Sequence, residues 1–244
     1  MSARILVVQH EAWCPPALIG AWLAESGCEV DVRRAWAEPL PSLQAYAGLL
    51  VLGGTMDAGA DGEHPWLPVT RDLIREAARR GVPALGICLG HQLTALALGG
   101  EVGRNPHGRT IGLRQVDWEP DALLDPLVGA MAGEDRALHW NQDVVTRLPA
   151  DAAVLATTLD GAVQAARFAP TVWGVQFHPE ADLDVARGWA DLDPGALARL
   201  DMTAEEVLTT MDLAGPELTK TWKPLAAAFA ALVRGRAAAT ELSH

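Results

Sequence analysis

A cysteine flanked by glycines is the residue of this chain that is best suited to nucleophilic chemistry. Cys88 follows an apolar run and is the third residue of the segment GICLG (residues 86–90), after which the pattern becomes helical. The glycines leave room for a sharp strand-to-helix turn, a nucleophile elbow, with the nucleophile at its tip. The N-terminus of the following helix favours a thiolate at this position. The alternative is a small buried cysteine at the end of a core strand.

A second segment supplies a base and a carboxylate. The run TVWGVQFHPE (residues 171–180) is an apolar strand that ends in His178 and Glu180. A cysteine nucleophile needs a nearby base, and that base needs a third group to orient it. Groups that follow strands gather at one edge of an open α/β sheet. We therefore predict a catalytic triad of Cys88, His178 and Glu180, against the alternative that His178 lies in a surface turn.

Length and charge limit the classes of function. The chain has 244 residues, half of them apolar, which suits a single domain over residues 1–244. Nineteen Lys and Arg against 31 Asp and Glu give a net charge of −12, without a basic stripe, and this argues against binding to nucleic acid or to an anionic membrane.

The cysteines and the apolar runs indicate where the protein works. Cys14, Cys28 and Cys88 lack the spacing of metal ligands, so we predict no metal site and a reducing compartment. The N-terminal apolar run is too short for a signal peptide, and no run reaches transmembrane length. We expect a cytoplasmic protein.

The elements that must position the triad alternate between strand and helix in the first hundred residues. Apolar runs predict strands over 5–8, 28–33, 48–52 and 82–87, and helical patterns cover 15–26 and 66–80. This alternation predicts an α/β fold with a doubly wound, mostly parallel, flavodoxin-like sheet.

Beyond the elbow helix the pattern changes. Short strands follow one another over 110–118, 136–140, 153–157, 162–168 and 172–177, which predicts a mixed or antiparallel extension of the sheet. Residues 182–244 read as a helical part packed on the same domain. In that part Thr203 and Glu206 form a capping box, Gly215-Pro216 is expected to end the helix, and Pro224 to begin or kink the last one.

Three motifs together resemble the class I, triad-type glutamine amidotransferases. They are LGG (52–54), GICLGHQ (86–92) and GVQFHPE (174–180), in the order and spacing of that family. The resemblance implies hydrolysis of the glutamine side-chain amide through a γ-glutamyl thioester on Cys88, with no organic cofactor and no metal. It also implies an oxyanion hole made by the backbone of Gly54 and Leu89, although the family usually has proline where this chain has Thr55.

The same resemblance suggests residues that bind substrate. Gln92 occupies the position at which the family uses a glutamine to hold the substrate. The segment HWNQD (139–143) resembles the loop that binds the substrate α-carboxylate, which assigns Gln142 and Asp143 to the same task. Trp13 is the tryptophan that we expect over the site. Histidines outside the motifs, among them His10, we expect at the surface or in turns.

Several functions remain open at this point. The ammonia acceptor is unidentified, and it would be a separate synthase subunit unless the chain is a free-standing hydrolase. A hydrolase of γ-glutamyl peptides or amines would use the same triad on a larger leaving group. A regulatory or binding module that keeps the fold without turnover is the alternative from another class.

Overall fold

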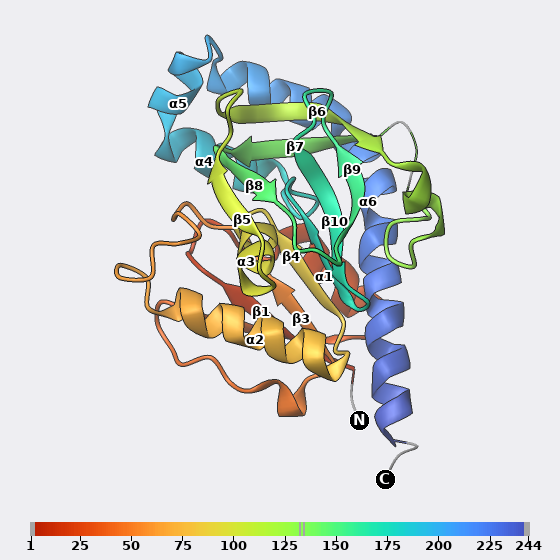
Figure 1. Cartoon of the computed structure of the whole chain (residues 1–244). Coiled ribbons are helices and arrows are strands. Elements are labelled where there is room, and N and C mark those ends of the chain that lie inside the picture. The colour runs from red at the N-terminus through yellow and green to blue at the C-terminus, as the bar shows by residue number, and fades with distance from the viewer. Residues whose placement is uncertain (1–2, 132, 134, 242–244) are drawn as a thin grey trace.

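The N-terminal half of the chain forms the parallel part of one sheet. The computed structural model describes residues 3–131, 133 and 135–241. Four neighbouring strands pair in parallel, in the order β2 (Glu29–Arg34), β1 (Arg4–Gln9), β3 (Gly48–Val51) and β4 (Ala84–Ile87). One helix each follows β1, β3 and β4, namely α1 (Ala17–Glu25), α2 (Trp66–Arg80) and α3 (Leu89–Ala97) (Figure 1). The prediction of a doubly wound parallel sheet is confirmed.

The sheet continues beyond β4 with strands from the second half of the chain. They follow in the order β11 (Val172–Val175), β10 (Val163–Ala169), β9 (Ala153–Thr157), β6 (Thr110–Trp118) and β7 (Asp135–Asn141). β11 is parallel to β4, and every later pair is antiparallel. The predicted antiparallel extension is therefore confirmed.

A separate two-stranded ribbon pairs β5 (Glu101–Arg104) with β8 (Asp143–Arg147). The sequence pattern does not predict these strands, because they are short and charged residues interrupt their apolar alternation. Single 3₁₀ turns lie at η1 (Leu43–Ala45) and η2 (Pro120–Leu124).

Three helices complete the fold, α4 (Leu183–Leu192), α5 (Pro194–Arg199) and α6 (Ala204–Glu241). Asp193 caps α5, because its side chain accepts a hydrogen bond of 2.9 Å from the backbone N–H of Ala196. The predicted capping box opens α6, where the N–H and hydroxyl of Thr203 both donate to the Glu206 carboxylate at 2.8 Å.

The prediction that Gly215-Pro216 ends a helix is wrong, because α6 continues through both Pro216 and Pro224. A proline inside a helix costs about 3 kcal/mol, since it removes a backbone hydrogen bond and crowds the preceding turn. Trp222, Leu225 and Phe229 follow on the buried face of α6 and join the core. Burial of each large apolar side chain contributes about 1.5–3 kcal/mol, so the packing of this face offsets a cost of the size that the two prolines impose.

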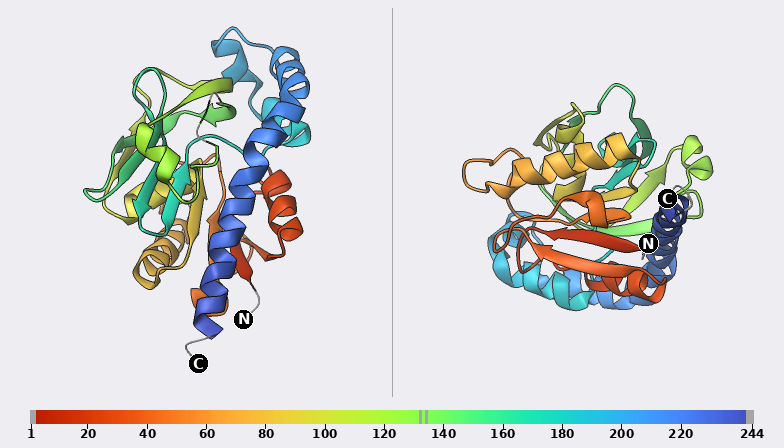
Figure 2. Two further views of the ribbon diagram at one scale, coloured as in Figure 1. Left: turned by 90° about the vertical axis from the view of Figure 1, so that its right-hand side faces the viewer. Right: turned by 90° about the horizontal axis from the view of Figure 1, so that it is seen from below.

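The core lies on both faces of the sheet, as the sequence of β1 illustrates. Ile5 and Val7 pack in one cluster with side chains of α1 and α6, while Leu6 and Val8 pack in another with side chains of α2 and α3. All four side chains are buried completely. Figure 2 shows α6 running along one side of the sheet beside α1. A continuous apolar run is what a strand covered on both faces requires.

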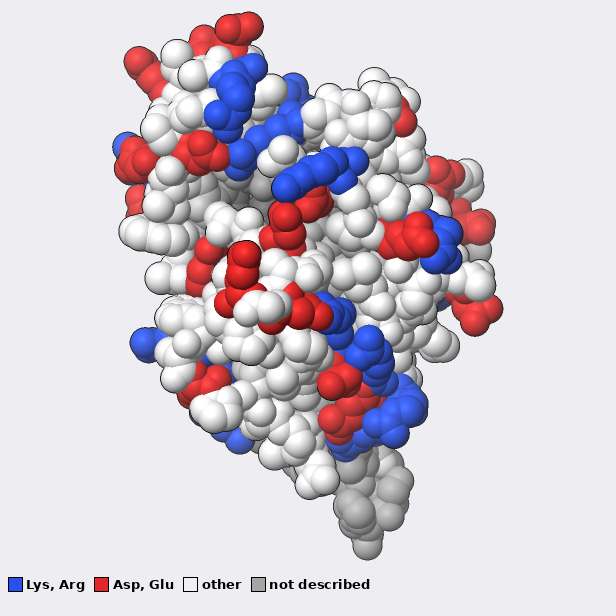
Figure 3. All heavy atoms as spheres, turned by 60° about the vertical axis from the view of Figure 1, so that its left-hand side comes forward, with Lys and Arg blue, Asp and Glu red and all other residues white. Residues whose placement is uncertain are grey.

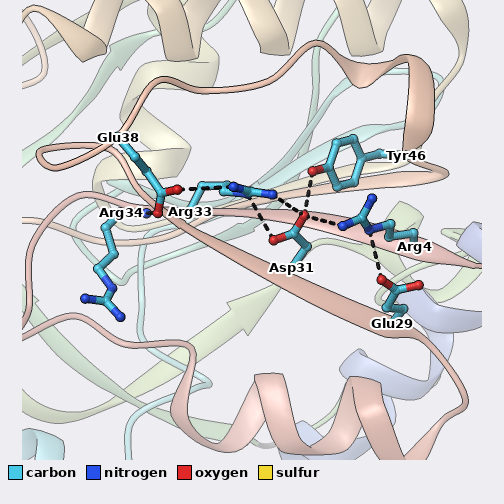
Figure 4. A network of polar contacts seen from close by, with 7 residues as sticks. All are labelled: Arg4, Glu29, Asp31, Arg33, Arg34, Glu38 and Tyr46. Carbon is cyan, nitrogen blue, oxygen red and sulfur yellow. Dashed lines mark hydrogen bonds and ion pairs between the residues drawn. The ribbon is translucent and has the colours of Figure 1, made fainter.

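The outer strand β2 carries a network of charged side chains (Figure 4). Asp31 accepts hydrogen bonds from the Tyr46 hydroxyl at 2.6 Å and from Arg4 at 2.8 Å, and Arg33 bridges Asp31 and Glu38. Burial raises the pKa of Asp31, but hydrogen bonds from Tyr46 and Arg33 outweigh it and the pKa is lowered. Charges along an edge strand oppose pairing with another chain.

No helix among the described residues combines the length and the apolar character that crossing a membrane demands.

Candidate active site

Cys88 lies at the junction of β4 and α3 in a backbone conformation that is rare for a residue with a side chain. Its φ of 51° and ψ of −104° turn the chain sharply from strand to helix. A side chain at position 86 would collide with the backbone of Gly90, and one at position 90 with the carbonyl of Val51. Both glycines are thus required by the close approach of the helix to the sheet, which is the geometry of a nucleophile elbow.

The neighbouring strand brings His178 to the elbow. β11 pairs in parallel with β4, with Val175 opposite Ile87, so the segments that follow both strands lie side by side. The N–H of Cys88 donates to the carbonyl of Val175 at 2.8 Å. His178 Nδ1 lies 2.7 Å from Glu180 Oε1, and both side chains are almost completely buried. The structure therefore brings the three predicted triad residues together.

The surroundings of His178 favour its protonated form. Burial alone would lower the pKa of this imidazole, but the Glu180 carboxylate and the neighbouring Cys88 side chain raise it to about 10. The indole of Trp189 on α4 packs on the imidazole, with ring centroids 4.5 Å apart. Trp189 in turn donates to the backbone carbonyl of Trp13 at 2.8 Å.

A cavity of about 580 Å³ opens above Cys88 and His178. Its apolar lining includes Trp13, as predicted, together with Trp140 and Trp189. Charged side chains of both signs gather on the face that Figure 3 presents. The charged residues that line the cavity are Glu11, Asp57, Arg104, Arg109, Asp143 and Asp193.

The residues assigned to the oxyanion hole lie close to each other. Gly54 follows β3 and lines the cavity, and a side chain there would come within 2.8 Å of Leu89 Cδ2. The preceding Gly53 is packed closely, because an added Cβ would lie 3.1 Å from His178 Cε1 and 3.6 Å from Cys88 Cβ. Leu89 is the first residue of α3, where backbone N–H groups have no acceptor within the helix.

The residues assigned to substrate binding also line the cavity. Gln92 Nε2 donates to the Asp143 carbonyl at 3.0 Å and to Gln176 Oε1 at 3.3 Å. The Asp143 carboxylate accepts a 2.8 Å hydrogen bond from Arg104. Gln142 lies between the ends of β7 and β8 at the cavity wall. Within the described residues no cluster of His, Cys, Asp and Glu side chains is arranged to hold a metal ion.

Sequence reasoning missed two features of the site. Gln176 Nε2 lies 3.6 Å from Cys88 Sγ, although the motif analysis gave this glutamine no role. Its place two residues before His178 is the available signal, because alternate residues of an extended chain point to the same side. The expectation that His10 lies at the surface is wrong. His10 is fully buried and accepts a 3.1 Å hydrogen bond from Trp66, and burial lowers its pKa to about 3.

The cysteines offer a direct test of the elbow. We expect iodoacetamide to alkylate Cys88 at least about tenfold faster than Cys14 or Cys28 near neutral pH, because the thiolate is the reactive form. Burial raises the pKa of both other thiols, for Cys14 well above its ordinary value with a further contribution from Glu11. Peptide mapping after limited labelling measures the three rates. Equal labelling would count against the elbow as an activating site.

Several known proteins are similar to this chain in sequence and in fold. The family model named glutamine amidotransferase class-I matches residues 18–188. γ-Glutamyl peptidase 5 of Arabidopsis thaliana is 28% identical over 210 residues, which cover 84% of this chain and 82% of that protein. Anthranilate synthase component 2 of Azospirillum brasilense is 32% identical over 169 residues, 66% of this chain and 79% of that protein.

A solved structure extends the similarity to nearly the whole fold. The crystal structure of a glutamine amido transferase from Methylobacillus flagellatus superimposes with a TM-score of 0.85 at 28% identity, covering 95% of this chain and 96% of that one. Other relatives are much longer. The chain is 37% identical to an aminodeoxychorismate synthase of Streptomyces griseus over 122 residues and covers only 16% of that protein's length.

Proposed function

Since this chain belongs to the class I glutamine amidotransferase family, we propose that it hydrolyses the side-chain amide of L-glutamine through a γ-glutamyl thioester. The observation that supports this proposal most is the placement of His178 between Glu180 and Cys88 at the base of a cavity. Trp189 of α4 packs on His178, which supports the proposal that the helical part over residues 182–244 belongs to the same single domain.

The reaction proceeds in two balanced steps. In the first, the Cys88 thiolate attacks the amide carbon, and the backbone N–H groups of Gly54 and Leu89 stabilise the oxyanion. His178 gives its proton to the departing nitrogen, so the C–N bond breaks, ammonia leaves and a thioester remains. In the second step water loses a proton to His178 and attacks the thioester carbon. The C–S bond then breaks, which releases glutamate and restores Cys88.

The remaining residues orient the reacting groups. Glu180 holds His178 in position through Nδ1 and stabilises its protonated form. Gln92, Gln142 and Asp143 form the wall that holds the glutamyl part of the substrate. This wall is already ordered, because Gln92 donates to the backbone of Asp143.

A γ-glutamyl peptide or amine is the second candidate substrate. The similarity to a γ-glutamyl peptidase extends over 84% of this chain, and the cavity of about 580 Å³ falls in the range of sites that hold ligands larger than one amino acid. The same two steps apply, with an amine leaving in place of ammonia. If glutamine is the substrate, a separate synthase subunit accepts the ammonia unless the chain is a free-standing hydrolase.

Release of glutamate from a panel of substrates tests the proposal. The purified chain is incubated with glutamine, a γ-glutamyl dipeptide and a γ-glutamyl amine, with and without cell extract, while ammonia and glutamate are measured. We expect glutamate from at least one of them. Stimulation of glutamine hydrolysis by extract supports a synthase partner, and turnover of the dipeptide alone supports the free-standing hydrolase. No glutamate and no Cys88 thioester under any condition would support a binding module instead.

A further inference from the structure

The loop that carries Gly54 cannot fix its own orientation. Glycine has no side chain to restrict its backbone, so a peptide next to glycine turns at low steric cost. Neighbouring side chains lie close to Gly54, since an added Cβ would lie 2.6 Å from Met56 Sδ and 2.8 Å from Leu89 Cδ2. On its N-terminal side Gly53 packs against His178 and Cys88. Contacts on the C-terminal side must supply the rest of the restraint.

Glu11 supplies that restraint from the loop after β1. Its Oε1 accepts a 2.9 Å hydrogen bond from the backbone N–H of Thr55, and its Oε2 accepts one of 2.8 Å from the Thr55 hydroxyl. The first of these bonds is made by the peptide unit that joins Gly54 to Thr55. Because a peptide unit is planar, fixing its N–H also fixes the carbonyl of Gly54. The N–H of Gly54 belongs to the preceding peptide unit, so once the carbonyl is fixed, the direction of that N–H depends only on the φ and ψ angles of Gly54.

Glu11 is itself held in place on the side toward β1. Its backbone carbonyl accepts hydrogen bonds from Gln9 Nε2 at 2.9 Å and from the N–H of Cys14 at 3.3 Å. Its carboxylate also lies 3.4 Å from Cys14 Sγ. Because contacts hold both the backbone and the carboxylate of Glu11, its side chain can position the loop that it contacts. A freely rotating surface carboxylate could not.

We propose that Glu11 is a positioning residue that fixes the peptide unit between Gly54 and Thr55 and thereby keeps the N–H of Gly54 in the oxyanion-binding orientation. This inference rests on the proposed function of the same site.

Glu11 also lines the cavity, so direct contact with the substrate is the competing role. The two roles differ in their kinetics. A group that orients the oxyanion donor acts mainly on kcat, whereas a group that binds ground state and transition state alike acts on KM.

Substitution of Glu11 separates the two roles. We expect Glu11→Ala to lower kcat at least about tenfold, toward the hundred- to thousandfold cost of losing one oxyanion donor, with KM changed less than about threefold. Glu11→Gln keeps one acceptor oxygen and should fall between wild type and Glu11→Ala. If Glu11→Ala does not fold, this conservative variant carries the test.

A double-mutant cycle and a matched control complete the experiment. Thr55→Pro removes both the backbone N–H and the hydroxyl that donate to Glu11. Adding Glu11→Ala to this variant should therefore lower kcat by less than about a further twofold. Glu206→Ala removes the same pair of hydrogen bonds from Thr203, but at the start of α6 and outside the cavity. We expect that control to lower the melting temperature and to leave kcat within about twofold.

Four results would overturn the inference. A raised KM with unchanged kcat would assign Glu11 to substrate binding, and wild-type kinetics of Glu11→Ala would remove any role. If the effects of Glu11→Ala and Thr55→Pro on kcat were fully additive, Glu11 would not act through Thr55. Absence of wild-type turnover on every γ-glutamyl substrate would overturn the proposed function, and this inference with it.

Discussion

Replacing Cys88 by serine is expected to lower kcat/KM by roughly 10⁴- to 10⁶-fold, the range of losses found when single residues of a triad are removed. Serine has nearly the same size, so it fits the turn at φ 51° and leaves the contacts of the elbow intact. Its hydroxyl stays protonated beside His178, and the first step loses its nucleophile. Steady-state release of glutamate, with circular dichroism to show an unchanged fold, measures the effect.

The other cysteines provide the control for this experiment. Cys28 is buried like Cys88 but does not line the cavity. Cys28→Ser therefore makes the same change of sulfur to oxygen at a position outside the active site. It should retain activity within about twofold, because substitutions at independent sites have independent effects. If Cys88→Ser kept even about one hundredth of wild-type activity, far more than loss of a triad nucleophile allows, Cys88 would not be the nucleophile.

His178→Ala is expected to cause the second largest loss, roughly 10⁴-fold or more in kcat/KM, because the first step needs His178 as a proton donor and the second needs it as a proton acceptor. Glu180→Gln should retain measurable activity above that of His178→Ala, since the packing of Trp189 still orients the imidazole. Near wild-type hydrolysis by His178→Ala would show the triad assignment to be wrong.

The dependence on pH distinguishes the roles of His178 and Glu180. The pKa of His178 is raised to about 10, so the first step should slow as the pH rises through that value and the imidazole loses its proton. Removing the Glu180 charge removes a favourable interaction with the protonated form, which lowers the pKa. The alkaline limb of the rate profile should therefore move toward neutral pH in Glu180→Gln, and an unmoved limb would contradict the assignment.

Local sequence patterns predict much of this fold because the strands near the site are strongly apolar. The run before Cys88 and the run before His178 each predict a strand, and parallel pairing of β4 with β11 then places both residues at one edge. Such local patterns do not predict that α6 continues through its two prolines. Its prolines favour a helix end locally, and only the packing of residues such as Trp222 and Phe229 on the sheet decides otherwise.

The parts of the site that sequence reasoning missed depend on contacts between distant segments. Glu11 reaches Thr55 across 44 positions of the chain, and no motif contains Glu11 or links it to Thr55. His10 looks like a loop residue until α2 brings Trp66 against it. Such pairings come from the topology of the whole sheet, whereas the elbow is encoded in a few adjacent residues.

Detection of a covalent intermediate on Cys88 tests the central claim most directly. The wild-type chain is mixed with the substrate that it turns over, quenched in acid within the first turnovers, digested and analysed by mass spectrometry. We predict a γ-glutamyl adduct on the peptide that contains Cys88, absent from Cys88→Ser and from samples chased with buffer. Turnover without any adduct at Cys88 in the quenched samples, or an adduct on Cys14 in its place, would contradict the account.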